Sequence, residues 1–348
     1  MPARGMAAAA SHGLCYTFAM RTAWRNAGAY IALAVVIVVF AVLQPQFRQP
    51  SNLLNILDQS VEISIVAVGM TAVILTAGID LSVGSIAALS AFLAAWVMTH
   101  EAHALGGLAG TALAGFVIAL ATGAAAGLCN GLAVTRLRVP PFIVTLGAMT
   151  MLRGLVYIAS HGTGISSGIP PLFEVTARNL ISIRSSNGFE TNLTLAILVM
   201  AVIYAIGYIV LTRTAVGRSI YAIGGNESAA RLSGLPVDRI LIGVYISAGV
   251  LAAVGGIIEA ATVGAAVPDA GTDLELNAIA AVVIGGTSLF GGQGSLAGTF
   301  AGALLMRTIR NGLNLTNVDS NWQRVTIGSV IILAVAFDEF QKRRRSRT

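Results

Sequence analysis

Residues 195–210 read LAILVMAVIYAIGYIV, and residues 31–42 read IALAVVIVVFAV. Neither stretch contains a charged residue, and neither alternates apolar with polar residues as a strand of a membrane barrel would. A helix needs about 20 mainly apolar residues to cross a bilayer. Because a backbone inside lipid must satisfy its own hydrogen bonds, such runs predict membrane-spanning helices.

The composition of the whole chain agrees with these runs. Of its 348 residues, 56% are hydrophobic and 10% are charged, whereas a soluble domain carries about a quarter charged residues. A net charge of +6 would raise nucleic-acid binding in a soluble protein. Here it indicates basic loops on the cytoplasmic side of a membrane, so we expect no nucleic-acid partner. The cysteines, Cys15 and Cys129, suggest no disulfide framework.

We therefore predict an all-α polytopic membrane protein with about ten transmembrane helices. They fall at residues 27–43, 60–78, 83–99, 106–130, 141–160, 192–211, 240–262, 275–290, 295–311 and 323–338. The pairs 60–78 with 83–99 and 275–290 with 295–311 are joined by Gly-rich breaks and could instead be broken or re-entrant helices. The predicted transmembrane domain covers residues 27–340, with tails at 1–26 and 341–348.

The basic residues predict that both tails are cytoplasmic. The C-terminal tail contains Lys342, Arg343, Arg344, Arg345 and Arg347, and the N-terminal tail contains Arg4, Arg21 and Arg25. Loops rich in Lys and Arg stay on the cytoplasmic side. Arg307 and Arg310, which we place near an outer loop, fit this orientation poorly. A targeting segment at the N-terminus is the less favoured alternative, because His12 and Arg21 interrupt its short apolar stretch.

Small residues recur every four positions on two of the predicted helices. They are Gly107, Thr111, Gly115, Ala119, Gly123, Gly127 and Gly131 on one, and Gly294, Gly298 and Gly302 on the other. This spacing lets helix backbones approach closely within lipid. We expect tight packing within one subunit, and a seam between subunits is the alternative.

The sequence offers no catalytic or metal-binding constellation. Its only lysine is Lys342, in the tail, so the chain cannot form the phosphate-binding loop that needs a lysine after a Gly-rich turn. The cluster His100-Glu101-Ala102-His103 lacks a third ligand nearby and is interpreted as a solvated turn. We predict no enzyme, no cofactor and no metal in this chain. Any ATP hydrolysis would need another subunit to hold ATP and Mg. A membrane enzyme is the disfavoured alternative.

Polar residues within the predicted spans are costly and therefore candidates for a translocation path or gate. The first pair, Asp80 and Ser82, lies in the Gly-rich break Gly78–Ser85. Either side chain could instead cap the following helix by accepting its free N–H groups. A second Gly-rich break, Gly286–Gly292, weakly resembles the first, and paired breaks can mark a transport site.

Four further candidates for the path or gate are Arg153, Glu259, Glu275 and Asn277. Arg153 needs a partner, for which Asp80, Glu259 and Glu275 are candidates, or it could extend to the outer interface. Glu275 and Asn277 could hydrogen-bond sugar hydroxyls. Because acidic residues in the first turn of a helix also complement its dipole, a structural role is an equally favoured alternative.

A polar segment between two spans is a candidate docking site for a soluble partner. We expect a short helix from Glu227 to Leu232, following a Gly-Gly turn and ended by Gly234. Its candidate contact residues are Tyr221, Gly224, Gly225, Asn226, Glu227, Ala229, Ala230, Arg231 and Gly234. The alternative is an ordinary charged loop.

Four segments together resemble the permease subunits of bacterial sugar importers driven by an ATP-binding-cassette ATPase. They are Ala67–Thr71 running into Gly78–Ser85, then Tyr221–Gly234, Gly255–Glu259 and Ala278–Leu289. The likeness covers roughly residues 45–340 and points to the group of ribose, xylose and arabinose permeases, most closely the ribose members. Residues 1–26 have no counterpart in it.

The resemblance implies a function and a set of partners. It implies a permease homodimer in the inner membrane, a cytoplasmic ATPase and an extracytoplasmic sugar-binding protein. A monosaccharide would cross by alternating access, and Tyr221–Gly234 resembles the stretch that couples permease to ATPase. Ribose permeases typically carry an acidic residue where this chain has Asn277.

The alternative to an ATP-driven importer is an ion-coupled secondary transporter that uses Asp80, Glu259 or Glu275.

Overall fold

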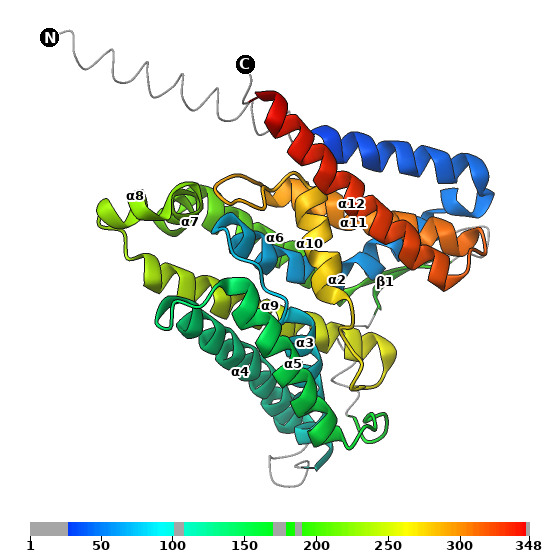
Figure 1. Cartoon of the computed structure of the whole chain (residues 1–348). Helices are drawn as coiled ribbons and strands as arrows, with labels where there is room; N and C mark the ends of the chain where they lie inside the picture. The colour runs from blue at the N-terminus through cyan, green and yellow to red at the C-terminus, as the bar shows by residue number, and fades with distance from the viewer. Residues whose placement is uncertain (1–26, 101–107, 170–178, 185–189, 346–348) are drawn as a thin grey trace, which may run out of the picture.

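The computed structural model describes residues 27–100, 108–169, 179–184 and 190–345, which form a helical bundle with one β-hairpin (Figure 1). An apolar helix, Ala27–Leu43, comes first. The later elements are η1 (Pro45–Arg48), α2 (Pro50–Leu75), α3 (Val83–His100), α4 (Leu108–Thr135), α5 (Pro141–Ser160), β1 (Asn179–Arg184), β2 (Glu190–Thr194), α6 (Leu195–Arg213), α7 (Ala215–Gly225), α8 (Glu227–Leu232), α9 (Val237–Val263), α10 (Leu274–Ile284), α11 (Leu296–Leu315) and α12 (Ser320–Arg345).

A helix lies at each of the predicted ranges, although some boundaries differ. α2 begins at Pro50 instead of residue 60, because its first turns are helical but polar and so escape a search for apolar runs. α10 ends at Ile284, not at residue 290. Just after this end, Gly286 takes a positive φ of 88°, which residues other than glycine avoid. α12 continues to Arg345, within the predicted tail.

By length and composition, 6 of the described helices could cross a membrane: α2, α3, α4, α5, α6 and α9. Ala27–Leu43 and α10 are apolar but shorter. α11 is not among the six, and Arg307 and Arg310 lie within it. A polytopic membrane protein is therefore supported. The count of about ten crossings, the cytoplasmic position of both ends and the limits of the transmembrane domain stay predictions. Residues 1–26 lie outside the described part of the chain.

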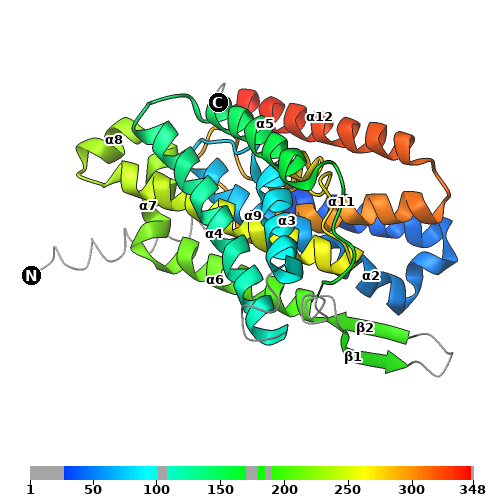
Figure 2. The ribbon, with the colours of Figure 1, turned by 90° about the horizontal axis from the view of Figure 1, so that it is seen from below.

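A β-hairpin interrupts the helical pattern that we predicted as all-α. β1 and β2 pair antiparallel, with Ser182 opposite Asn192, and the hairpin projects from the bundle (Figure 2). Ile181 and Ile183 alternate with Ser182 and Arg184, which is the period-2 pattern of a strand. That local signal was available in the sequence, but the surrounding apolar helices obscured it.

The small residues predicted to pack helices do so within this chain. α4 lies along α9, and a Cβ added at Gly249 in α9 would fall 2.1 Å from the carbonyl oxygen of Gly123 in α4. A Cβ at Gly127 would fall 2.2 Å from the carbonyl oxygen of Tyr245. Gly302 likewise lies against the Ala281 carbonyl of α10. The packing interpretation is confirmed at these positions, whereas Gly107 lies outside the described residues.

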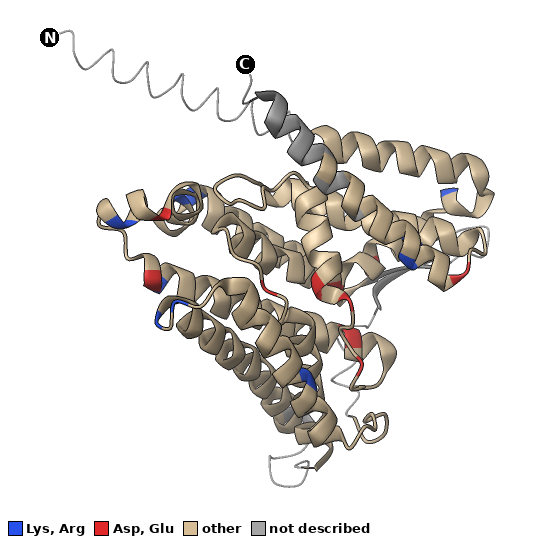
Figure 3. Ribbon diagram, viewed as in Figure 1, with Lys and Arg blue, Asp and Glu red and all other residues tan. Residues whose placement is uncertain are grey.

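The bundle has two distinct ends. α7 and α8 lie at one end and the β-hairpin at the other, in both views (Figures 1 and 2). Most of the helical ribbon between them carries no charged residue (Figure 3). α9 runs through the centre and packs against α2, α3 and α4.

We predict that Gly249→Ala destabilises the protein by about 1–3 kcal/mol, because the new methyl group would overlap the α4 backbone. Gly243→Ala, on the same helix, is the matched control, since a Cβ there meets nothing within 4 Å. Thermal unfolding of both variants in the same detergent measures the difference. Equal melting temperatures would contradict the proposed close contact of α4 with α9.

Candidate functional site

The predicted short helix at Glu227–Leu232 is present as α8, so its start and end are confirmed. The Asn226 side chain begins it by accepting a hydrogen bond from the Ala229 N–H at 2.9 Å. Gly234, with φ of 79°, follows its end. The expected Gly-Gly turn is wrong, because Gly224 and Gly225 form the last turn of α7 and the chain breaks at Asn226.

α8 has a buried anchor and an exposed tip. Ala230 packs in a small apolar cluster with Ile223, Val237 and Leu241, which fixes α8 against α7 and α9. Leu232, by contrast, is 91% exposed at the end of the helix. α8 is thus held on its buried side, while its tip is not covered by the described part of this chain.

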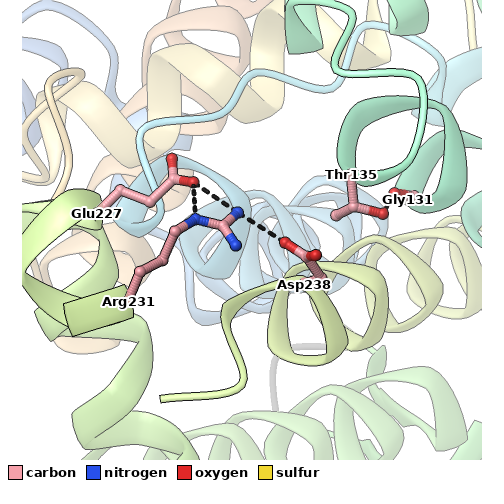
Figure 4. Close-up of polar contacts among 5 residues, drawn as sticks. All are labelled: Gly131, Thr135, Glu227, Arg231 and Asp238. Atoms are coloured by element: carbon pink, nitrogen blue, oxygen red, sulfur yellow. Dashed lines mark hydrogen bonds and ion pairs between the residues drawn. The ribbon is translucent and has the colours of Figure 1, made fainter. Parts of the chain in front are cut away.

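Arg231 joins α8 to the start of α9. Its Nη2 lies 2.8 Å from Glu227 Oε1 and 2.6 Å from Asp238 Oδ1, as Figure 4 shows. Hydrogen bonds to Asp238 and Glu227 raise the pKa of the Arg231 guanidinium above its usual value. All three side chains are half-exposed, so these pairs add little stability. Their effect is to orient α8.

α7 packs directly against the backbone of two other segments. A Cβ added at Gly224 would fall 1.7 Å from the Leu75 carbonyl oxygen at the end of α2, and 2.4 Å from the Gly292 N atom. Gly292 N–H itself donates to the Leu75 carbonyl at 2.9 Å. The Tyr221 hydroxyl donates to the Gly294 carbonyl at 3.0 Å, and burial raises the pKa of Tyr221. A displacement of α7 must therefore move α2 and the loop 285–295.

Asp80 and Ser82, in the break between α2 and α3, are fully buried and hydrogen-bonded. Asp80 Oδ1 accepts from the Ser82 N–H at 2.8 Å and from the Ser82 hydroxyl at 2.6 Å. Asn130 of α4 donates to the Ser82 hydroxyl at 2.8 Å. Asp80 was expected to accept hydrogen bonds from the first N–H groups of α3. This expectation is wrong, because its Oδ1 accepts from Ser82, which precedes the helix. Asp80 Oδ2 and the Tyr245 hydroxyl are both buried with no hydrogen-bond partner among the described residues.

Arg153 anchors the loop between α9 and α10. Its Nη1 donates to the carbonyls of Pro268 and Ala270, each at 2.7 Å. The expected ion pair with Asp80, Glu259 or Glu275 is absent from the ion pairs of the described residues. Backbone carbonyls satisfy the guanidinium instead, and one turn further along α5 the Tyr157 hydroxyl donates to Asp269.

The remaining acidic candidates meet at the first turn of α3. Glu259 Oε2 accepts from the Gly271 N–H at 2.9 Å. A Cβ at Gly84 would fall 2.2 Å from the Gly271 carbonyl oxygen and 2.4 Å from Glu275 Oε2. Asn277 donates to the Asp273 carbonyl at 2.8 Å, so it braces the start of α10. The structure thus gathers Glu259 and Glu275 beside the start of α3, just after Asp80 and Ser82.

Sequence reasoning missed Glu62 and its contact with Arg307. Glu62 lies in α2, and its Oε2 is 3.8 Å from Arg307 Nη2 in α11. Only 15% of the Arg307 side chain is exposed. Its expected place near an outer loop stays a prediction. Glu62 is the acidic residue that pairs with Arg307 among the described residues. The signal was a glutamate within an otherwise apolar run.

Comparison with known proteins identifies relatives over almost the whole chain. The family described as branched-chain amino acid transport system / permease component matches residues 52–335. The chain is 44% identical to the ribose import permease protein RbsC of Escherichia coli (strain K12) over 308 residues, 88% of this chain and 92% of that protein.

Two further relatives come from the same organism. The D-allose transport system permease protein AlsC is 35% identical over 316 residues, 90% of this chain and 92% of that protein. The galactose/methyl galactoside import permease protein MglC is 35% identical over 327 residues, 92% of this chain and 96% of that protein. No solved structure matches the chain.

We predict that Asn226→Ala loosens α8 by about 1 kcal/mol, because the Ala229 N–H loses its cap. Hydrogen exchange of residues 227–232 should become several-fold faster. Ser228→Ala is the matched control, since Ser228 is exposed on the same helix. Unchanged exchange in Asn226→Ala would show that the cap contributes nothing to α8.

Proposed function

Because the chain belongs to the family of branched-chain amino acid transport system / permease components, we propose that it is the permease subunit of an ATP-driven sugar importer. It is a multi-pass protein of the inner membrane. Relatives between 35% and 44% identical are named for ribose, D-allose and galactose. These names favour a monosaccharide, with ribose as the first candidate.

The observation that carries the proposal is the close backbone contact of Gly224 with Leu75 and Gly292. We place the ATPase on α8, where Leu232 fills an apolar pocket of the partner and the Glu227–Arg231–Asp238 group fixes the helix. The ATPase holds ATP and Mg. Closure of the ATPase pushes α7, and the backbone contacts pass that movement to α2 and to the loop 285–295.

The gate in this proposal is the first turn of α3. Leu75, which α7 contacts, lies shortly before Asp80 and Ser82, and Glu259 and Glu275 lie beside the next turn. Helix breaks of this kind place polar groups near the bilayer midplane in transporters. Arg153 and Asn277 hold the loop and helix that close over this point. A monosaccharide crosses as the assembly alternates between outward and inward states.

Further parts of the assembly follow from the same proposal. About ten helices cross the membrane with both termini cytoplasmic, which places α7–α8 inside and the hairpin outside. An extracytoplasmic binding protein delivers the sugar, and two permease copies form the transport unit.

An ion-coupled carrier is the second candidate, and one specific observation favours it. Asp80 Oδ2 and the Tyr245 hydroxyl have no hydrogen-bond partner within the described ranges and are buried at a helix break, where a coupling ion could bind. This carrier would take up sugar without ATP, and an uncoupler would abolish uptake.

We predict that Gly224→Ala reduces ATP-driven uptake at least about tenfold, because the new methyl group would displace α7 from α2 by overlap with the Leu75 carbonyl. Gly243→Ala, outside the predicted docking segment, is the control, since a Cβ there also meets nothing within 4 Å. The measurement is uptake of labelled D-ribose, D-allose and D-galactose by proteoliposomes that contain the permease, its co-purified ATPase and its binding protein.

The outcomes separate the candidates. Uptake that needs ATP, survives an uncoupler and fails only in Gly224→Ala supports the importer and the proposed contact. Uptake that persists without ATP and is lost with an uncoupler supports the ion-coupled carrier instead. Equal uptake by both glycine variants would remove α7 from the coupling route.

A further inference from the structure

An open polar depression lies at the end of α2 that is far from α7. Its volume is about 550 Å³, and its lining residues are Gln46, Gln49, Ser51, Asn52, Asn55 and Leu315. Small-molecule sites typically enclose roughly 300–1,000 Å³. Since α2 has 26 residues, its two ends are about 39 Å apart. The depression, named here the carboxamide pocket, therefore lies at the outer face in the proposed orientation.

Below the carboxamide pocket, α2 carries one polar stripe. Asn52, Asn55, Gln59 and Glu62 follow one another at steps of three and four, so they lie on one face of the helix. Gln59 donates to Asn55 at 3.0 Å. The buried residues of the same helix are mainly apolar.

A matching stripe on α11 faces it. Arg307, Asn311 and Asn314 also follow helical spacing. Asn52 and Asn311 exchange two hydrogen bonds, with Asn52 donating at 3.0 Å and Asn311 donating at 2.9 Å. The Glu62–Arg307 pair at 3.8 Å is the inner end of the seam. We call these facing stripes the polar seam.

The polar seam leads from the carboxamide pocket toward the gate. Glu62 lies against α9, where a Cβ added at Gly255 would fall 3.8 Å from Glu62 Cγ. One turn further along α9, Glu259 holds Gly271 beside the start of α3. Arg307 Nε is buried without a hydrogen-bond partner among the described residues. Asn55 and Gln59 are exposed, and a carboxamide in contact with lipid tails would be costly. This face of α2 is therefore unsuited to lipid tails, and an aqueous surrounding suits it.

We propose that the carboxamide pocket and the polar seam form an entry site within each permease chain for a neutral, polyhydroxylated solute. The inference rests on the proposed function, which supplies the outer orientation and the sugar. The site would receive the sugar before it reaches the gate.

The chemistry of the lining selects this class of ligand. A carboxamide both donates and accepts hydrogen bonds, as each sugar hydroxyl does. None of the residues that line the carboxamide pocket carries a charge, so the pocket offers no counter-ion to a phosphate or an amine. Leu315 adds an apolar surface for the C–H face of a sugar ring. An open, neutral site of this kind binds weakly, which suits a solute in transit.

The test removes two carboxamides that make no side-chain hydrogen bond within the described residues. Gln46→Leu/Gln49→Leu is compared with Gln46→Asn/Gln49→Asn, which keeps the carboxamides. Equilibrium dialysis measures binding of labelled D-ribose, D-allose and D-galactose to the full chain in nanodiscs. We expect saturable binding, about tenfold weaker in the leucine variant and restored in the asparagine variant.

Other outcomes overturn the inference. Unchanged binding in the leucine variant, or no saturable binding to the unaltered chain, would show that the carboxamide pocket is not a sugar site. Equal affinity for D-ribose 5-phosphate would exclude a neutral class of ligand. Protection of Gln46→Cys from a water-soluble thiol reagent only in a dimer would assign the pocket to a second copy.

The same proteoliposome assay keeps the two proposals separate. Normal ATP-driven sugar uptake by the unaltered complex and by the leucine variant alike would overturn the entry site and leave the importer standing. Absence of sugar uptake by the unaltered complex would overturn the importer itself.

Discussion

Direct backbone contact at glycine is the constraint on which the rest of the bundle depends. Within lipid, an apolar side chain gains little free energy by moving from lipid tails to a protein interior. Helices must therefore be held together by close packing of their backbones. Gly123 and Gly249 let α4 and α9 touch at their main chains, and Gly224 repeats the device between α7 and α2. One type of contact thus both builds the core and joins the docking segment to it.

This contact also explains how a segment at one end of the molecule can influence a buried site. Side-chain contacts between α7 and α2 could slip, but a backbone seated on a backbone has no rotamers to absorb a displacement. The Leu75 carbonyl lies shortly before the hydrogen-bonded break of Asp80 and Ser82, beside which Glu259 and Glu275 gather. In the proposed importer, energy enters as a shift between conformations, not as chemistry in this chain.

Polar groups on the helices of the bundle fall into two sets with different surroundings. Asp80, Ser82 and Arg153 are closed in by hydrogen bonds to other parts of the chain, which suits residues that hold a gate. Asn55 and Gln59 remain exposed along the polar seam, which suits contact with a passing solute. The carboxamide pocket and the gate would then act in sequence.

The sequence by itself determined that the chain is mainly helical and membrane-embedded, where its long apolar helices lie, and that Glu227–Leu232 forms a short helix ended by Gly234. Apolar run length and capping residues are local signals, so no fold is needed to interpret them. Only the tertiary structure decided that Arg153 binds carbonyls 115 and 117 positions away, that Glu62 pairs with Arg307, and that Gly224 touches Leu75. These contacts join residues distant in the chain, and their geometry depends on how the helices pack.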